Sequence, residues 1–202
     1  MRKSPRKKPV AASSKESMLR LILAVARKAG VKMAVGGGLA VNAHGFRRET
    51  DDVDAFFHYD DRHKVLRALH RLAPGFTIEE IDPSQWMAVP PGAEANQRID
   101  LLFTSGDPEE SAIEMSEERS YHGIEAPMFP VDLLVTSKFL CDRNEIKDVL
   151  DICTLHQRGA FDIEEIENRL VQMGFAEDAR RFRNFMASLE NLIASRRGEV
   201  SS

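Results

Sequence analysis

The fold of this 202-residue sequence is decided by two stretches, Val35-Gly36-Gly37-Gly38 and Arg48-Glu49-Thr50-Asp51-Asp52-Val53-Asp54. The first stretch ends an apolar strand predicted over residues 31–35 and leads into a helix that reaches Gly45. The second opens a strand over residues 53–59, whose Val, Phe and Tyr side chains suit a pleated surface. Because side chains alternate across a strand, Asp52 and Asp54 are expected on one face, with Asp51 and Val53 on the other.

Three carboxylates are candidates for holding a metal ion. Asp52 and Asp54 would lie about 7 Å apart on one strand face, where they repel each other unless a positive charge sits between them. Asp100 begins an apolar run on a later strand, where a carboxylate is costly unless it is used. Mg²⁺, or Mn²⁺ in its place, prefers oxygen ligands and would relieve the repulsion. A solvated acidic turn is the alternative for the first pair, and Asp82 or Asp107 are alternatives for the third carboxylate.

The glycine run offers a site for phosphate beside these carboxylates. Glycines at 36–38 leave backbone N–H groups unhindered at the start of a helix, whose positive end favours an anion. Arg48 and Thr50, just before the acidic pair, would contact phosphate or brace the loop. A phosphate-binding turn, two carboxylates on one strand and a third on the next predict a metal-dependent phosphoryl-transfer site.

The apolar pattern predicts an α/β fold, with a small mixed β-sheet flanked by helices and a helical C-terminal part. Three segments are expected: a flexible basic arm at 1–15, the α/β core at 16–130, and a helical region at 131–202 packed on the core. The further strands are predicted at 76–81, 85–89 and 98–103, and the further helices around 18–29, 65–72, 133–140, 149–156, 163–170 and 179–193. Asp162 and Glu165 form a capping box before the second-last of these helices.

Charge is spread unevenly along the chain. The chain carries 28 Lys+Arg and 32 Asp+Glu, for a net charge of −4, but residues 1–15 hold six basic residues and no acid, which leaves −10 on residues 16–202. The basic arm either steers the protein onto nucleic acid or serves as a solubilising tail. Two cysteines exclude a disulfide scaffold, and no membrane span or apolar signal-peptide core is recognisable, so a cytoplasmic protein is expected.

Several blocks of the sequence together resemble the nucleotidyltransferase-fold superfamily. The most similar members are small bacterial proteins related to abortive-infection and MenT-type toxin nucleotidyltransferases. The matching residues, spread over roughly residues 31–155, are Gly37-Gly38-Leu39-Ala40, His44-Gly45, Arg48, Thr50, Asp52-Val53-Asp54, Leu133-Leu134, Lys138, Arg143, Lys147-Asp148 and Asp151.

The resemblance implies a role for each matching residue. It assigns Asp52, Asp54 and Asp100 to the metal and to catalysis, with Asp100 also accepting the proton of the attacking hydroxyl. It gives His44 the task of bracing the glycine turn, and it makes Lys138 a catalytic lysine that meets the triphosphate. The implied nucleotide-binding residues are Gly37, Gly38, Arg48, Thr50, Lys138, Lys147 and Asp148. Arg47, Arg48, Lys138, Arg143 and Lys147 would supply a basic surface around the cleft.

The function implied by the resemblance is the Mg²⁺-dependent transfer of a nucleoside monophosphate from an NTP, such as ATP, to a hydroxyl with release of pyrophosphate. The acceptor would be tRNA or another RNA, a protein, or a small molecule, and a cognate partner protein would fit a toxin–antitoxin arrangement. A non-catalytic module that binds a nucleotide or a partner on the same fold is the alternative, because glycine stands where many superfamily members carry a serine at the turn. No serine-hydrolase elbow or P-loop motif is present.

Overall fold

One mixed sheet organises the computed structural model, which describes residues 14–94, 96–141 and 146–197. Within these residues the sheet has seven strands in the order β3-β4-β5-β2-β1-β7-β6. Their bounds are Ala34–Val35 (β1), Val53–His58 (β2), Thr77–Asp82 (β3), Gln85–Val89 (β4), Ile99–Thr104 (β5), Glu117–Tyr121 (β6) and Ile124–Met128 (β7). The central pair, β2 and β5, runs parallel, whereas β3–β4 and β6–β7 are antiparallel hairpins. This arrangement confirms the predicted α/β class.

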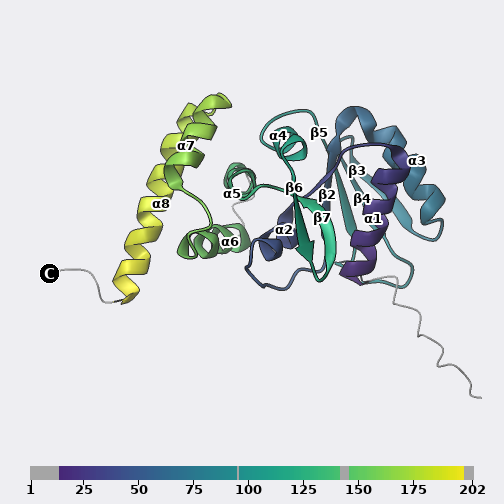
Figure 1. Ribbon diagram of the computed structural model, residues 1–202, viewed down its shortest axis with the longest axis horizontal. Coiled ribbons are helices and arrows are strands. Elements are labelled where there is room, and N and C mark those ends of the chain that lie inside the picture. The colour runs from purple at the N-terminus through teal and green to yellow at the C-terminus, as the bar shows by residue number, and fades with distance from the viewer. Residues whose placement is uncertain (1–13, 95, 142–145, 198–202) are drawn as a thin grey trace, which may run out of the picture.

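Two helices cover one face of the sheet, α1 (Lys15–Ala29) and α3 (Arg62–Leu72), as Figure 1 shows. Alternate residues of β2 are fully buried at 53, 55 and 57, while those at 54, 56 and 58 are only partly buried. Burial on that period of two fixes which side chains of β2 face the core. The face that carries Asp54 is therefore the one left available for a site.

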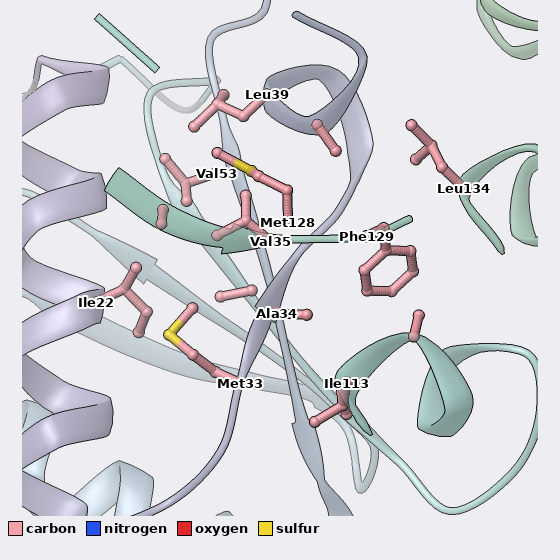
Figure 2. Packing of buried hydrophobic residues seen from close by; sticks show 14 of the residues in the cluster. Ile22, Met33, Ala34, Val35, Leu39, Val53, Ile113, Met128, Phe129 and Leu134 are labelled. Atoms are coloured by element: carbon pink, nitrogen blue, oxygen red, sulfur yellow. The ribbon is translucent and has the colours of Figure 1, made fainter. Parts of the chain in front are cut away.

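The hydrophobic core continues around β1 at the centre of the sheet. Figure 2 shows Ile22 of α1 on one side of the β1 ribbon, and Phe129 and Leu134 on the other side. Phe129 also stacks at a tilt on Phe56 of β2, with 4.6 Å between ring centroids. The sheet is thus packed on both faces near β1.

The C-terminal region is helical, as predicted, with α5 (Val131–Leu140), α6 (Ile146–Gln157), α7 (Ile163–Gln172) and α8 (Ala176–Arg197). Phe139 of α5 packs edge-on against Phe182 of α8, with ring centroids 5.0 Å apart. Asp162 caps α7 by accepting hydrogen bonds from the backbone N–H groups of the second and third helical residues. Figure 1 shows these helices on the side of the sheet away from α1 and α3, so α5 joins them to the core.

The structure departs from the sequence prediction in three places. The first strand is two residues long rather than five, because residues 31–33 lead into it without pairing. Helix α4 (Glu109–Glu114) and the β6–β7 hairpin were not predicted, since the edge strand β6 is mostly exposed and polar and carries no apolar alternation. The arm expected at 1–15 falls outside the described residues except for Ser14, which caps α1, and Lys15, which begins it. Arg143 also lies outside them.

Among the described residues, no helix combines the length and apolar character needed to cross a bilayer.

The packing of α8 on α5 can be tested by truncation of Phe182, which is fully buried. We expect Phe182→Ala to lower the free energy of unfolding by about 3–5 kcal/mol, because it removes a buried aromatic ring and leaves a cavity. Val171→Ala on α7 is the control, since Val171 is 54% exposed and should change stability by less than about 0.5 kcal/mol. Urea unfolding of both variants measures the difference, and equal stabilities would mean that α8 does not pack on α5 in solution.

Candidate active site

Three carboxylates converge at one end of β2 and β5. Asp54 and Asp100 are directly paired in the parallel register of the two strands, and Asp52 immediately precedes β2 on the same face as Asp54. One carboxylate oxygen from each of the three lies within 4.8 Å of the others. The hydroxyl of Thr50 donates to Asp52 Oδ1 at 2.8 Å and so orients that carboxylate. The predicted cluster is therefore assembled, with Asp100 as its third member.

The alternatives for the third carboxylate are not in the cluster. Asp82 caps the β3–β4 turn, where its Oδ1 accepts hydrogen bonds from the Ser84 backbone N–H and hydroxyl at 2.7 Å and 2.6 Å. Asp107 lines the same cleft as Asp100, but its carboxylate accepts a hydrogen bond from the Ser111 hydroxyl.

The electrostatic cost of the cluster falls mainly on Asp54. Burial, followed by the negative charges of Asp52 and Asp100, raises the pKa of the Asp54 carboxyl from its ordinary 3.8 to about 7, against the opposing effect of Lys138 and Lys147. The surrounding structure therefore holds the Asp54 carboxyl in place although burial and repulsion disfavour its charged form. A divalent cation would remove the repulsion, and three convergent carboxylate oxygens are the donor set that Mg²⁺ or Mn²⁺ prefers, so the residues present fit such an ion.

The glycine turn lies against these side chains. Gly37 has a φ of +53°, and a Cβ there would come within 1.6 Å of Asp54 Oδ2. A Cβ on Gly38 would come within 2.5 Å of the Thr50 hydroxyl oxygen. Glycine is thus required at both positions to let the backbone approach the acidic strand, whatever else the turn binds.

A cleft with a volume of about 930 Å³ opens beside the cluster. All ten residues predicted for the site line it: Gly37, Gly38, Arg48, Thr50, Asp52, Asp54, Asp100, Lys138, Lys147 and Asp148. Its wall also includes Phe175, which lies between α7 and α8, and Asp178 and Arg181 of α8. No sequence pattern marked the two α8 residues, because residues of α8 that line a cleft have the same pattern as residues that face solvent.

The cations of the cleft are paired with acids. Lys138 Nζ lies 2.6 Å from Asp148 Oδ1 and 2.8 Å from Asp151 Oδ2. Arg48 Nε lies 2.8 Å from Asp151 Oδ1. The basic surface predicted around the cleft is therefore largely neutralised where Arg48 and Lys138 contribute to it, and Arg47 is exposed outside the cleft lining.

Two further residues support the cluster without having been predicted to do so. Arg98 Nε donates to both oxygens of Asp100, at 2.8 Å and 3.1 Å. The signal for this contact was present, because residues two apart on a strand share a face. Asn42 holds the segment before β2, since its amide donates to the Arg48 carbonyl at 3.0 Å and its Oδ1 accepts from the Arg48 N–H at 2.8 Å. No sequence pattern marked Asn42.

His44 lies at the C-terminal end of the helix that the glycine turn opens, and its role in bracing that turn stays a prediction. Burial lowers the pKa of its imidazole, which favours the neutral ring. Its Nε2 lies 2.8 Å from the Phe129 carbonyl oxygen, and because a carbonyl can only accept, Nε2 carries the proton. This bond ties α2 (Gly37–Ala43) to the segment that leads into α5.

Comparison with known proteins adds a family match. The model of the family described as aminoglycoside-2''-adenylyltransferase matches residues 18–143. A search of curated proteins gives no match.

Solved structures of two antibiotic-modifying proteins are similar in fold. The solution structure of the antibiotic-resistance factor ANT(2'')-Ia has a TM-score of 0.54 at 17% identity, over 89% of this chain and 96% of that one. The crystal structure of ANT(2'')-Ia with adenylyl-2''-tobramycin has a TM-score of 0.53 at 17% identity, over 83% and 96%. The lincosamide adenylyltransferase LnuA, bound to lincomycin, has a TM-score of 0.50 at 21% identity, over 70% and 96%.

These matches confirm the nucleotidyltransferase fold predicted from the sequence. They do not test the finer resemblance to abortive-infection and MenT-type toxin nucleotidyltransferases, which stays a prediction.

The need for glycine at position 37 can be tested by Gly37→Ala. We expect the variant to lose several kcal/mol of stability or to displace the Asp54 side chain, because the new Cβ has no room beside it. Gly159→Ala is the matched control, since Gly159 also has a positive φ of +65° but a Cβ there meets nothing within 4 Å. The control should cost only about 1 kcal/mol. Thermal unfolding of the two variants measures the loss of stability in each. Equal losses of stability would contradict the close approach of Gly37 to Asp54.

The raised pKa of Asp54 predicts a pH dependence of stability in chelator. Below about pH 4 the carboxyl is protonated in both the folded and the unfolded chain, so its contribution to stability is fully present there. As the pH rises through about 7 that contribution is lost, because deprotonation is harder in the folded protein. We expect the free energy of unfolding of Asp54→Asn, relative to that of the wild type, to rise by on the order of 2 kcal/mol between about pH 5 and about pH 8.

Asp82→Asn serves as the control of opposite sign. Hydrogen bonds from Ser84 lower the pKa of Asp82, so its replacement should make the protein less stable than the wild type at about pH 8. Urea unfolding at the two pH values measures both differences. A gap between Asp54→Asn and wild type that is the same at both pH values would contradict the raised pKa.

Proposed function

Because this chain belongs to the aminoglycoside-2''-adenylyltransferase family, we propose that it transfers a nucleoside monophosphate from a metal-bound NTP to a hydroxyl of a small molecule. Nucleotidyl transfer follows from the family; the metal, the residue roles and the acceptor are the proposal. The observation that carries it is the convergence of Asp52, Asp54 and Asp100 within 4.8 Å on the wall of a cleft.

In the proposed reaction the acceptor oxygen attacks the α-phosphorus of the NTP, the bond from that phosphorus to the bridging oxygen breaks, and pyrophosphate leaves with the electron pair. Asp52 and Asp54, with Asp100, would hold Mg²⁺, which neutralises charge on the phosphates. Asp100 takes the proton of the attacking hydroxyl, and Arg98 keeps its carboxylate oriented for that step.

The triphosphate side of the cleft is assigned to the glycine turn and the cations. The backbone at Gly37 and Gly38 faces the cleft, and Arg48, Lys138 and Lys147 line it with donors suited to phosphate oxygens. Asp148 holds Lys138 by an ion pair. The nucleotide role proposed for Asp148 is therefore to fix this lysine.

A small-molecule acceptor suits the size and charge of the cleft. A volume of about 930 Å³ is in the range of ligand pockets and leaves room for an acceptor beside a nucleotide. Asp51, Asp107 and Glu109 add negative charge to the lining, which favours a cationic acceptor such as an amino sugar. ANT(2'')-Ia is described in complex with adenylyl-2''-tobramycin and LnuA as bound to lincomycin, so both are described with a small molecule.

The test is a transfer assay with each labelled NTP, Mg²⁺ or Mn²⁺, and a panel of aminoglycosides, lincosamides, total tRNA and cell protein. We expect label on a small-molecule hydroxyl, pyrophosphate release, and no transfer in EDTA. Asp52→Asn, Asp54→Asn and Asp100→Asn should each lose about a thousandfold in rate, which corresponds to about 4 kcal/mol of transition-state stabilisation. Asp82→Asn, in the β3–β4 turn and outside the cleft lining, should keep wild-type activity.

The same assay separates the alternatives. Label on tRNA or protein alone would replace the small-molecule acceptor by an RNA or protein acceptor. Nucleotide binding without pyrophosphate release from any NTP would favour the non-catalytic module. Transfer that survives Asp52→Asn would overturn the proposed site.

A further inference from the structure

Asp151 on α6 is a buried carboxylate next to the proposed active site. Its side chain is 1% exposed, and a charge so far from water is strongly unfavourable unless it is paired. Two cations lie against it, although its Oδ1 accepts no hydrogen bond within the described residues. Arg48 Nε lies 2.8 Å from Oδ1 and one terminal guanidinium nitrogen of Arg48 donates to Oδ2 at 3.1 Å, while Lys138 Nζ lies 2.8 Å from Oδ2.

The three charged groups come from three separate parts of the chain. Arg48 lies in the segment before β2, Lys138 on α5 and Asp151 on α6. Arg48 is held at both ends, because Asn42 binds its backbone N–H and carbonyl while Asp151 binds its guanidinium. Gly38 leaves room for that guanidinium, since a Cβ there would lie 3.0 Å from one of its terminal nitrogens.

Both cations line the cleft, and Asp151 is not among the lining residues. Whatever Asp151 does for a bound nucleotide, it therefore does through Arg48 and Lys138. Hydrogen bonds within the described residues engage two of the five N–H groups of Arg48, and Lys138 Nζ is within ion-pair distance of two carboxylates. The remaining donors can serve an anion while the others hold the side chains in place.

We propose that Asp151 is a positioning residue, which fixes Arg48 and Lys138 in the arrangement that receives the triphosphate of the NTP. The inference rests on the proposed function only in requiring that the cleft binds an NTP. It adds Asp151 to the residues of α6 that serve nucleotide binding, beside Lys147 and Asp148, although Asp151 does not touch the nucleotide.

The charges of this group let one variant separate positioning from simple electrostatics. Arg48, Lys138, Asp148 and Asp151 sum to zero, so this group attracts a triphosphate through the direction of its donors more than through net charge. Asp151→Asn leaves the group with a charge of +1. Simple electrostatics then predicts tighter binding of the NTP, whereas loss of positioning predicts weaker binding.

The experiment measures the Kd of ATP with Mg²⁺ by calorimetry, together with KM and kcat where transfer is detected. We expect Asp151→Asn to weaken ATP binding about tenfold or more and to raise KM to a similar extent. Asp132→Asn is the matched control, because Asp132 on α5 is a largely buried carboxylate paired with Arg169 of α7, outside the cleft lining. The control should lose stability but keep the Kd within about twofold. Unchanged or tighter ATP binding by Asp151→Asn overturns the proposal.

A second variant keeps the test decisive if Asp151→Asn folds poorly. Arg48→Lys retains the charge but removes the two-pronged contact with Asp151. We expect it to weaken ATP binding, and we expect the double variant Arg48→Lys/Asp151→Asn to bind no worse than the weaker single variant, because both remove the same contact. Multiplied losses in the double variant would show that Arg48 acts independently of Asp151 and would refute the proposal. An absence of transfer in the wild type, with ATP binding intact, would count against the proposed function alone.

Discussion

The parallel register of β2 and β5 is the constraint on which the rest of the site depends. It sets Asp54 directly beside Asp100, and Asp52 follows because it shares a strand face with Asp54. Burial of Val53, Ala55 and Phe57 beneath α1 and α3 fixes this register, since a slip of one residue would turn a carboxylate into the core. Burial of the hydrophobic face of β2 thus keeps the carboxylates of Asp52, Asp54 and Asp100 close together although they repel one another.

The repulsion is then offset by what surrounds the carboxylates. Arg98 neutralises Asp100 from the same strand face, and Lys138 and Lys147 lower the pKa of Asp54 against the effect of burial. Gly37 lets the turn pack directly on Asp54, which leaves that carboxylate little freedom to move away from its neighbours. The molecule therefore carries a destabilising cluster that a divalent cation would relieve, which is the arrangement expected when stability is given up for function.

Much of the fold and of the site could be predicted from the sequence, because the decisive signals are local. Alternation indicated the two faces of β2, and the glycine run marked a turn with an unhindered backbone, although its packing against Asp54 was not predicted. The pairing of Asp100 with Asp54 could only be inferred from its strand context, because register between distant strands is a tertiary property. Asn42 and the α8 residues of the cleft wall were missed for the same reason: their roles come from contacts across the fold, and their residue types fit any exposed helix.

The division of labour between the sheet and the C-terminal helices has a consequence for specificity. The carboxylates are positioned by strands whose register is fixed by the core, whereas the outer wall of the cleft, including Asp178 and Arg181, comes from a helix joined to that core through α5. The buried pairing of Asp151 with Arg48 and Lys138 links the two parts at the point where the triphosphate is proposed to bind. Substitutions along α8 are therefore expected to reshape the outer wall of the cleft without moving the carboxylates, because the strands β2 and β5 position Asp54 and Asp100.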